Sequence, residues 1–230
     1  MGLVVLPSGA PTPWSPQGQL HADLTARVAV APNTGTGTAL TKSCRVVTLD
    51  QLDDGAGTWR LDLGPEQALI LTHTDLCLDT FLAEGQLRTD DGPWPTLGFR
   101  RFRAGTEVFL LAESPATLWL KARPLPLWRH RPLRLDGPSF CVSSTSGLEL
   151  CELSPARDAR VVLLRFPPDS SIGWHEHERG EELVVVQGCL HDDQGIYPRG
   201  SWLRQPAGSG HEVHSPEGCM LYTHSGHLAR

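Results

Sequence analysis

An internal repeat limits the possible folds of this chain more than any other feature of its sequence. When the 230-residue sequence is aligned with itself at an offset of 103, eleven of the 64 positions from 58 to 121 meet an identical residue. The matches continue without a gap and fall on turn residues such as Gly85 with Gly188 and Pro95 with Pro198. Turns restrict residue choice through their backbone geometry, so the pattern predicts two copies of one structural unit.

The repeat divides the chain into two domains, 1–123 and 124–230, joined near Pro124-Leu-Pro126. A chain of 230 residues allows one large domain or two small ones. Two domains of about 115 residues could each bury an adequate core.

Short apolar segments between turn residues predict an all-β fold. Gly and Pro number 23 and 19, too many for a helical bundle and too few for a disordered or collagen-like chain. No segment keeps a 3.6-residue period over three turns. The clearest strand candidates are 68–71, 108–111, 117–120, 161–164, 183–186 and 220–222, and residues 25–30 could form a further strand.

Charge and cysteine content narrow the class of protein. The net charge is −6 and no basic block occurs, which argues against nucleic acid as a partner. No apolar run approaches the roughly 18 residues of a membrane span, and residues 1–6 lack the basic start of a signal peptide. The six cysteines form no Cys-x-x-Cys pair and are expected to be reduced core residues. A cytoplasmic location follows from these features.

The second copy carries a set of metal-ligand residues. His175 and His177 are two residues apart, so on a strand both point to one face. Glu181 follows a turn at Gly180 and can return a carboxylate to the same place, and His211 follows another turn. Three imidazoles and one carboxylate suit a divalent transition metal such as zinc, iron, manganese, nickel or copper, and the spacing of the ligands does not select one of them. The sequence therefore predicts one metal site in the second domain.

The spacing of these residues resembles the two motifs of the cupin superfamily. The first motif corresponds to His175, His177, Glu181 and Gly188, and the second to Gly200, Pro206, Gly208 and His211. Residues 161–220 are more closely similar to the cupin domain of the ChrR-like family, named after an anti-sigma factor whose cupin domain binds zinc. The resemblance implies two tandem cupin domains of the RmlC-like jelly-roll β-barrel type, a bicupin.

The sequence departs from this resemblance in three respects. The usual Asn of the second motif is replaced by Ser215, and the Cys-x-x-Cys of the anti-sigma zinc domain is missing. At the 103-residue offset, the four ligand positions correspond to Thr72, Thr74, Leu78 and Val108. The first domain is therefore expected to be a degenerate cupin without metal. A site slipped by one residue, with His73, Asp75 and Asp79, remains as an alternative.

Other polar residues have less specific interpretations. His214 is expected on the strand face opposite His211, and Trp174 is expected to face away from His175. Tyr222 and His224 share one strand face and could line a pocket. Arg204 recurs as Arg101, which favours a structural salt bridge, and His191 is expected at the surface.

Two functions fit the predicted site. One is a sensing or small-ligand-binding role like that of the ChrR-like cupin domains. The other is a cupin-type dioxygenase that acts on a small diketone or a similar chelating substrate, although the sequence offers no clear acid or base besides Glu181. A homodimer and a small-molecule ligand are open as partners, and no protein partner is indicated.

Overall fold

The computed structural model describes most of the chain as β-structure. The described residues are 2–6, 27–32, 36–51, 55–73, 75–124, 132–143, 147–154 and 160–228. All the regular elements within these residues are strands, which confirms the all-β prediction. No helix of a length and hydrophobicity suited to crossing a membrane occurs among them. The chain separates into two compact units, residues 1–22 with 35–137 and residues 23–34 with 138–230.

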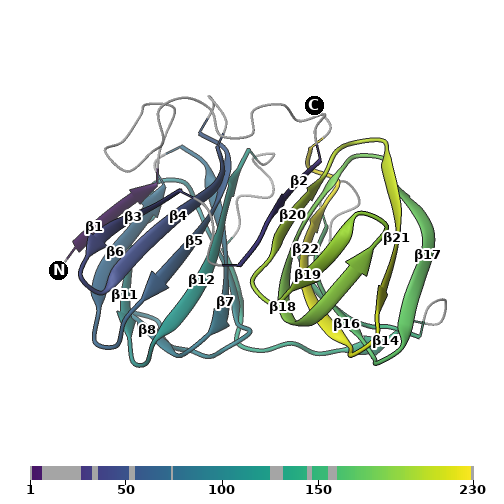
Figure 1. Ribbon diagram of the computed structural model, residues 1–230. Coiled ribbons are helices and arrows are strands. Elements are labelled where there is room, and N and C mark those ends of the chain that lie inside the picture. Colours follow the sequence, from purple (N-terminus) through teal and green to yellow (C-terminus); the bar gives the residue numbers. More distant parts are fainter. Residues whose placement is uncertain are drawn as a thin grey trace. The chain divides into compact units, whose positions relative to one another are not determined.

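The first unit contains two sheets (Figure 1). The smaller sheet has the order β1 (Gly2–Leu6), β6 (Ala68–His73), β11 (Val108–Ala112), β8 (Leu87–Thr89), β9 (Gly92–Trp94). The larger has the order β13 (Leu133–Leu135), β10 (Phe99–Phe102), β7 (Cys77–Glu84), β12 (Ala116–Arg123), β5 (Gly57–Leu63), β4 (Cys44–Gln51), β3 (Thr36–Thr41). Strands β1 and β6 are parallel, and the other pairs within this unit's described residues are antiparallel.

The second unit repeats this arrangement. Its main sheet has the order β14 (Cys141–Val142), β15 (Glu149–Ser154), β16 (Arg160–Phe166), β22 (Cys219–Ser225), β18 (Glu181–Asp192), β20 (Trp202–Gln205), β2 (Val28–Val30). The end of the long strand β18 continues into the second layer, where it pairs with β19 (Gly195–Pro198) and β21 (Ser209–Ser215). Strand β21 also pairs with β17 (Ser170–His177), and Figure 1 shows these two strands together at the edge of this unit.

The strands of the two units correspond at the 103-residue offset. Strand β5 (57–63) matches β16 (160–166), and β10 (99–102) matches β20 (202–205), at both ends. The pairing register is also the same, since Arg101 lies opposite Asp79 and Arg204 lies opposite Glu182. The repeat seen in the sequence is therefore a repeat of strand order and register.

One pair of equivalent glycines explains part of this correspondence. Gly85 and Gly188 have positive φ values of 85° and 70°. A Cβ atom added to Gly85 would lie 2.2 Å from the carbonyl oxygen of Pro115, and one added to Gly188 would lie 2.0 Å from that of Gly218. Both the backbone conformation and the close approach of a neighbouring strand require glycine here.

The division between the units differs from the expected boundary at residue 123. Strand β13 pairs with β10, so residues 133–135 belong to the first unit. Strand β2 pairs with β20, so residues 28–30 belong to the second unit although they precede the first unit's larger sheet in the chain. Residues 25 and 26 of the expected strand and 125 and 126 of the expected linker lie outside the described residues.

Each unit has its own apolar core. In the first unit this core includes the fully buried Trp59 and Trp94. In the second unit it includes the side chains of Phe166, Leu183, Leu203 and Leu221. All six cysteines are free, and four are buried, as expected for reduced core residues: Cys44, Cys77, Cys151 and Cys219.

Candidate metal centre

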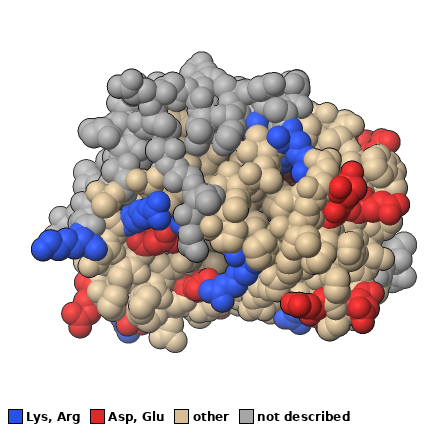
Figure 2. Space-filling model, viewed as in Figure 1, with Lys and Arg blue, Asp and Glu red and all other residues tan. Residues whose placement is uncertain are grey.

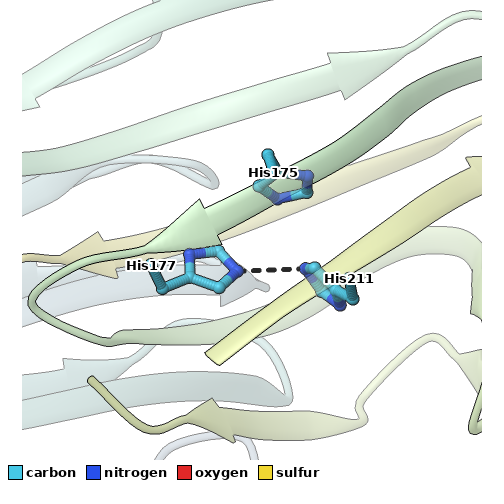
Figure 3. A group of neighbouring side chains, drawn as sticks. All are labelled: His175, His177 and His211. Atoms are coloured by element: carbon cyan, nitrogen blue, oxygen red, sulfur yellow. Dashed lines mark hydrogen bonds between the residues drawn. The ribbon is translucent and has the colours of Figure 1, made fainter. Parts of the chain in front are cut away.

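Three of the four predicted ligands come together in the second unit. His175 and His177 lie on β17 and His211 lies on β21, directly opposite His175 in the strand pairing. The three ring centroids are 4.8–5.0 Å apart, and one potential ligand atom from each ring lies within 4.8 Å of the others. Figure 3 shows the rings directed toward one another from two neighbouring strands. It is the single three-ligand group among the described residues.

A β-bulge in β17 turns these histidines toward the interior. Ile172 packs against the core and lies opposite Val213, but the pairing register shifts between Ile172 and His175. In a regular strand with Ile172 inward, Trp174 would point inward and His175 outward. The extra residue in β17 reverses this alternation, so His175 points inward and Trp174 is 63 % exposed. The bulge is thus the local feature that forms the site.

Contacts at the Nδ1 atoms of His175 and His211 leave the Nε2 atoms of these two rings available to a metal. Nδ1 of His175 donates to the carbonyl oxygen of Gly173 at 3.1 Å. Nδ1 of His211 lies 3.3 Å from a carboxylate oxygen of Asp192. The Nε2 atoms of His177 and His211 face each other at 3.1 Å, as the dashed line in Figure 3 marks. This polarity is typical of metal-binding imidazoles, whose outer nitrogen contacts an acceptor.

The surroundings of the rings favour their neutral form. His177 and His211 are 8 % and 2 % exposed. Burial, with a smaller effect from the neighbouring His211 and His175, lowers the pKa of His177 to about 4. Burial also lowers the pKa of His211, although Asp192 acts in the opposite direction. Neutral imidazoles are the form that binds metal, so the chemistry of this donor set fits a transition metal.

Glu181 lies beside the three histidines but is not part of their group. Its carboxylate oxygen is 3.9 Å from Nδ1 of His177, on the side of the ring away from His211. Its side chain is 15 % exposed, and burial raises its pKa to about 8. In this structure Glu181 therefore contacts a predicted ligand from outside, and its own role as a ligand stays a prediction.

The first unit has no equivalent bulge. Leu71 lies opposite Val108 there, as His175 lies opposite His211 in the second unit. The amide of Gly105 donates to the carbonyl oxygen of His73, as that of Gly208 donates to His177. By strand pairing and hydrogen bonding, the positions equivalent to the three histidines are therefore Leu71, His73 and Val108. The gap-free alignment, which gave Thr72 and Thr74, is out of register by one residue here because β17 contains the insertion.

His73 has a structural role in this position. It is 2 % exposed, and its Nδ1 accepts hydrogen bonds from the amides of Asp75 and Leu76 at 3.3 and 3.1 Å. Its Nε2 donates to the carbonyl oxygen of Gly55 at 3.2 Å. Asp79, the third residue of the slipped alternative, pairs with Arg101 and Arg123. These residues are engaged in buried hydrogen bonds and ion pairs, and they do not form a metal-ligand group.

The remaining candidates lie away from the three-histidine group. His214 is exposed and stacks near His191, with ring centroids 4.9 Å apart. Tyr222 and His224 are buried and bonded to each other at 2.6 Å. They alternate along β22 with the core residue Leu221, so they occupy the opposite face of that sheet and do not line the site.

Sequence reasoning missed three residues that surround His211. Besides Asp192, the side-chain Nε2 of Gln205 lies 3.2 Å from Nδ1 of His211. Arg27, from the segment before β2, contacts both Asp192 and Gln205. Asp192 and Gln205 differ in charge or polarity from the aligned residues of the first copy, Thr89 and Phe102, and this difference is visible in the sequence. No feature of the sequence near Arg27 indicates its contact with Asp192.

A hollow of about 250 Å³ opens beside His177. It is lined by the following residues: Arg160, Glu176, His177, Glu178, Arg179, Gly180, Ser225 and Gly226. Its lining thus contains both arginine and glutamate side chains. On the right-hand part of Figure 2, acidic side chains are more prominent than basic ones.

Comparisons with known proteins indicate which families and structures the chain resembles. Residues 140–229 match the family model of the ChrR cupin-like domain. The fold is similar to a candidate dioxygenase of Nostoc punctiforme, with a TM-score of 0.71 and 13 % identity, covering 97 % of this chain and 95 % of the other. These findings support the cupin superfamily. No curated protein matches the chain.

Two further cupin-like structures share the fold at low identity. Bacterial pirin YhhW of Escherichia coli, determined with nickel(II), has a TM-score of 0.66 and 12 % identity, covering 87 % of this chain and 98 % of the other. A variant of oxalate decarboxylase of Bacillus subtilis has a TM-score of 0.64 and 11 % identity, covering 87 % and 77 %. At these identities the likeness shows the cupin fold alone.

Proposed function

We propose that the chain is a bicupin whose second domain holds one divalent metal ion, zinc in preference to iron, manganese or nickel, and senses or binds a small ligand there. The observation that carries the proposal is the convergence of three buried or half-buried imidazoles, two of which have an acceptor at Nδ1. The first domain, whose described residues include no such ligand group, then has a structural role. The six free cysteines support a cytoplasmic location for such a protein.

The chain's own residues would hold the metal as follows. His175, His177 and His211 would bind through Nε2, while Gly173 and Asp192 fix the orientation of two of the rings. Glu181 is close enough to His177 to serve as a fourth ligand after a side-chain rotation, and a nearby cation would lower its raised pKa. A metal held this way supplies a Lewis acid that can polarise a bound oxygen atom.

A ligand-binding role is favoured over catalysis by the residues around the metal site. The hollow beside His177 offers space for a small polar ligand and contains both arginine and glutamate side chains. Among the described residues, the carboxylates in contact with the three-histidine group are Glu181 and Asp192, and Asp192 is held by hydrogen bonds from Arg27 and Tyr197. If Glu181 binds the metal, it is not available as a base.

The alternative is a dioxygenase that acts on a small diketone or a similar chelating substrate. One observation favours it, namely the fold similarity to the candidate dioxygenase of Nostoc punctiforme over almost the whole chain. A face of three imidazoles also leaves coordination positions for a chelating substrate and oxygen.

The test begins with the chelator-treated full chain, titrated with zinc, nickel, manganese and iron(II). We expect one tight site and a rise in thermal stability, because a metal that binds only the folded state stabilises it. The metal-loaded chain is then exposed to a panel of diketones and hydroxy acids while ligand binding and oxygen uptake are measured.

Two variants of strand β21 distinguish the effect of losing a metal ligand from that of losing an exposed histidine. His211→Ala should abolish tight binding, whereas His214→Ala, on the exposed face of the same strand, should bind like the wild type. Ligand binding without oxygen uptake supports the sensing role. Sustained oxygen uptake with any substrate, lost in His211→Ala, would replace it with the dioxygenase.

A further inference from the structure

We infer that Arg27 and Asp192 are positioning residues of the metal centre, which couple metal binding by His211 to the docking of the N-terminal strand β2. The inference rests on the proposed metal site. It adds that metal binding depends on strand β2, which is remote from His211 in the sequence. Arg27 lies 184 positions before His211 in the chain.

Asp192 is built to hold His211 in one orientation. Its side chain has no exposed surface, and Oδ2 lies 3.3 Å from Nδ1 of His211. The other oxygen, Oδ1, accepts hydrogen bonds from the amides of Gln194 and Gly195 and from the hydroxyl of Tyr197. The carboxylate is therefore fixed from several sides, and it accepts the Nδ1 proton of the tautomer whose Nε2 is free to bind a metal.

Arg27 joins this carboxylate to the N-terminal strand. Its Nη2 donates to Asp192 at 2.5 Å and to the Tyr197 hydroxyl at 2.8 Å. Its Nη1 donates to the side chain of Gln194 at 2.7 Å, and its Nε donates to the oxygen of Gln205 at 3.1 Å. Because Gln205 and Asp192 are the two side chains next to Nδ1 of His211, Arg27 holds both of them.

The position of Arg27 follows from strand pairing. Val28, Ala29 and Val30 pair with Arg204, Leu203 and Trp202, so β2 forms the edge of the main sheet beside β20 (Figure 1). Arg27 immediately precedes this strand, and its side chain is 18 % exposed. Anything that displaces β2 from β20 would also withdraw the guanidinium from Asp192.

The first unit shows that this network is not required by the fold. Strand β13 occupies the place of β2 there, and the pairing register puts Pro132 at the position of Arg27. Thr89 and Phe102 stand where the second unit has Asp192 and Gln205. The same strands form without any of the three polar residues, so the network accompanies the three histidines and not the architecture.

Coupling must act in both directions. Removing the carboxylate or the guanidinium should weaken metal binding, by about 10–100-fold for an outer contact of this kind. Conversely, bound metal should stabilise the docked β2 and slow hydrogen exchange at the amides of Val28–Val30.

The experiment measures zinc affinity of the full chain as wild type, Arg27→Ala, Arg27→Lys, Asp192→Asn and the control Arg165→Ala. Arg165 pairs with Glu149 on the same unit, away from the histidines. We expect Asp192→Asn and Arg27→Ala to lower affinity by about 10–100-fold, partial rescue in Arg27→Lys, and no change in the control. The absorbance spectrum of bound cobalt(II) should change in Asp192→Asn, which a loss of stability alone would not produce.

Hydrogen exchange supplies a readout that does not depend on variants. Metal should protect residues 28–30 and leave residues 141–142, at the opposite edge of the same sheet, unchanged. If wild type binds no metal, the proposed function fails. If wild type binds metal, but Arg27→Ala and Asp192→Asn bind it equally well and exchange at 28–30 is unchanged, the coupling alone is refuted.

Discussion

The two units of this chain share strand order, register and an equivalent glycine turn, yet among the described residues one has three convergent histidines and the other has no such group. The difference lies in the residue types at two equivalent positions, Leu71 and Val108 against His175 and His211, and in one extra residue of β17. In the first unit β6 alternates regularly, with Leu69, Leu71 and His73 on one face. In the second unit the bulge after Ile172 changes which residues face inward. The ligand-bearing strand thus differs from the structural one both in the insertion and in having His175 where the first unit has Leu71.

The comparison also separates residues needed for folding from residues needed for the site. Both units bury ionic or polar groups at equivalent places, such as Asp79 with Arg101 and Glu182 opposite Arg204. Such groups occur in both units, so we assign them to the fold and not to the metal site. Asp192 and Gln205 have no carboxylate or amide counterpart at the aligned positions, which hold Thr89 and Phe102, so we assign them to the site.

Giving the second unit the residues of the first should produce the largest effect. The double variant His175→Leu and His211→Val places the residue types of Leu71 and Val108 at the equivalent positions, which removes two of the three imidazoles while keeping apolar side chains on the same strand faces. We expect metal affinity to fall by on the order of 100-fold or more, beyond the effect of losing an outer contact. Isothermal titration measures the affinity, and circular dichroism with thermal melting checks that the strands remain. Wild-type affinity in the folded double variant would show that His175 and His211 are not metal ligands.

The second prediction contrasts two histidines at equivalent positions. His177→Ala should lose tight metal binding while its effect on metal-free stability is small, because removing the ring relieves a crowded group of imidazoles. His73→Ala should leave metal binding intact but lower the free energy of unfolding by about 1–3 kcal/mol, since it removes a buried ring that accepts from two part-buried amides. Urea unfolding and metal titration of both variants test this. Loss of metal in His73→Ala would place a second ligand group in the first unit.

The third and smallest effect concerns pH. In the metal-free protein Glu181 has its pKa raised to about 8 by burial, whereas the aligned residue in the first copy is Leu78. The folded state therefore keeps a proton that the unfolded state releases, so stability falls as pH rises toward 8. Above pH 6.5, His177, whose pKa is lowered to about 4, is largely neutral in both the folded and the unfolded protein. It therefore does not change the stability between pH 6.5 and 8.

Between pH 6.5 and 8 we expect the free energy of unfolding to fall by about 2 kcal/mol. Glu181→Gln should remove this slope, because glutamine does not titrate. Urea unfolding with a chelator present, at both pH values, measures it. An unchanged slope in Glu181→Gln would mean that the carboxylate is already ionised in the folded protein.

Much of this arrangement could be predicted from the sequence because it depends on local signals. The all-β class followed from short apolar segments and turn residues, and the three histidines followed from their spacing. The exposed Trp174 and His214 followed from strand alternation. Turn glycines such as Gly188 made the repeat visible, since their backbone conformation leaves few alternatives.

What the sequence did not predict depends on pairing between distant strands. A bulge adds one residue to one strand, and the alignment at a fixed offset cannot detect it where the flanking residues differ. Arg27 reaches Asp192 only because β2 pairs with β20, which also moved residues 23–34 into the second unit. Neither the bulge in β17 nor the pairing of β2 with β20 leaves a sequence pattern near the residues concerned.

The most direct test of the central claim is the metal content of the full chain. The chain is loaded with excess zinc, desalted and analysed by mass spectrometry of the metal, beside a variant in which His175, His177 and His211 are all alanine. One equivalent per chain in the wild type and none in the variant is the predicted result. Two tightly bound equivalents in the wild type, or one retained by the variant, would contradict a single metal centre in the second unit.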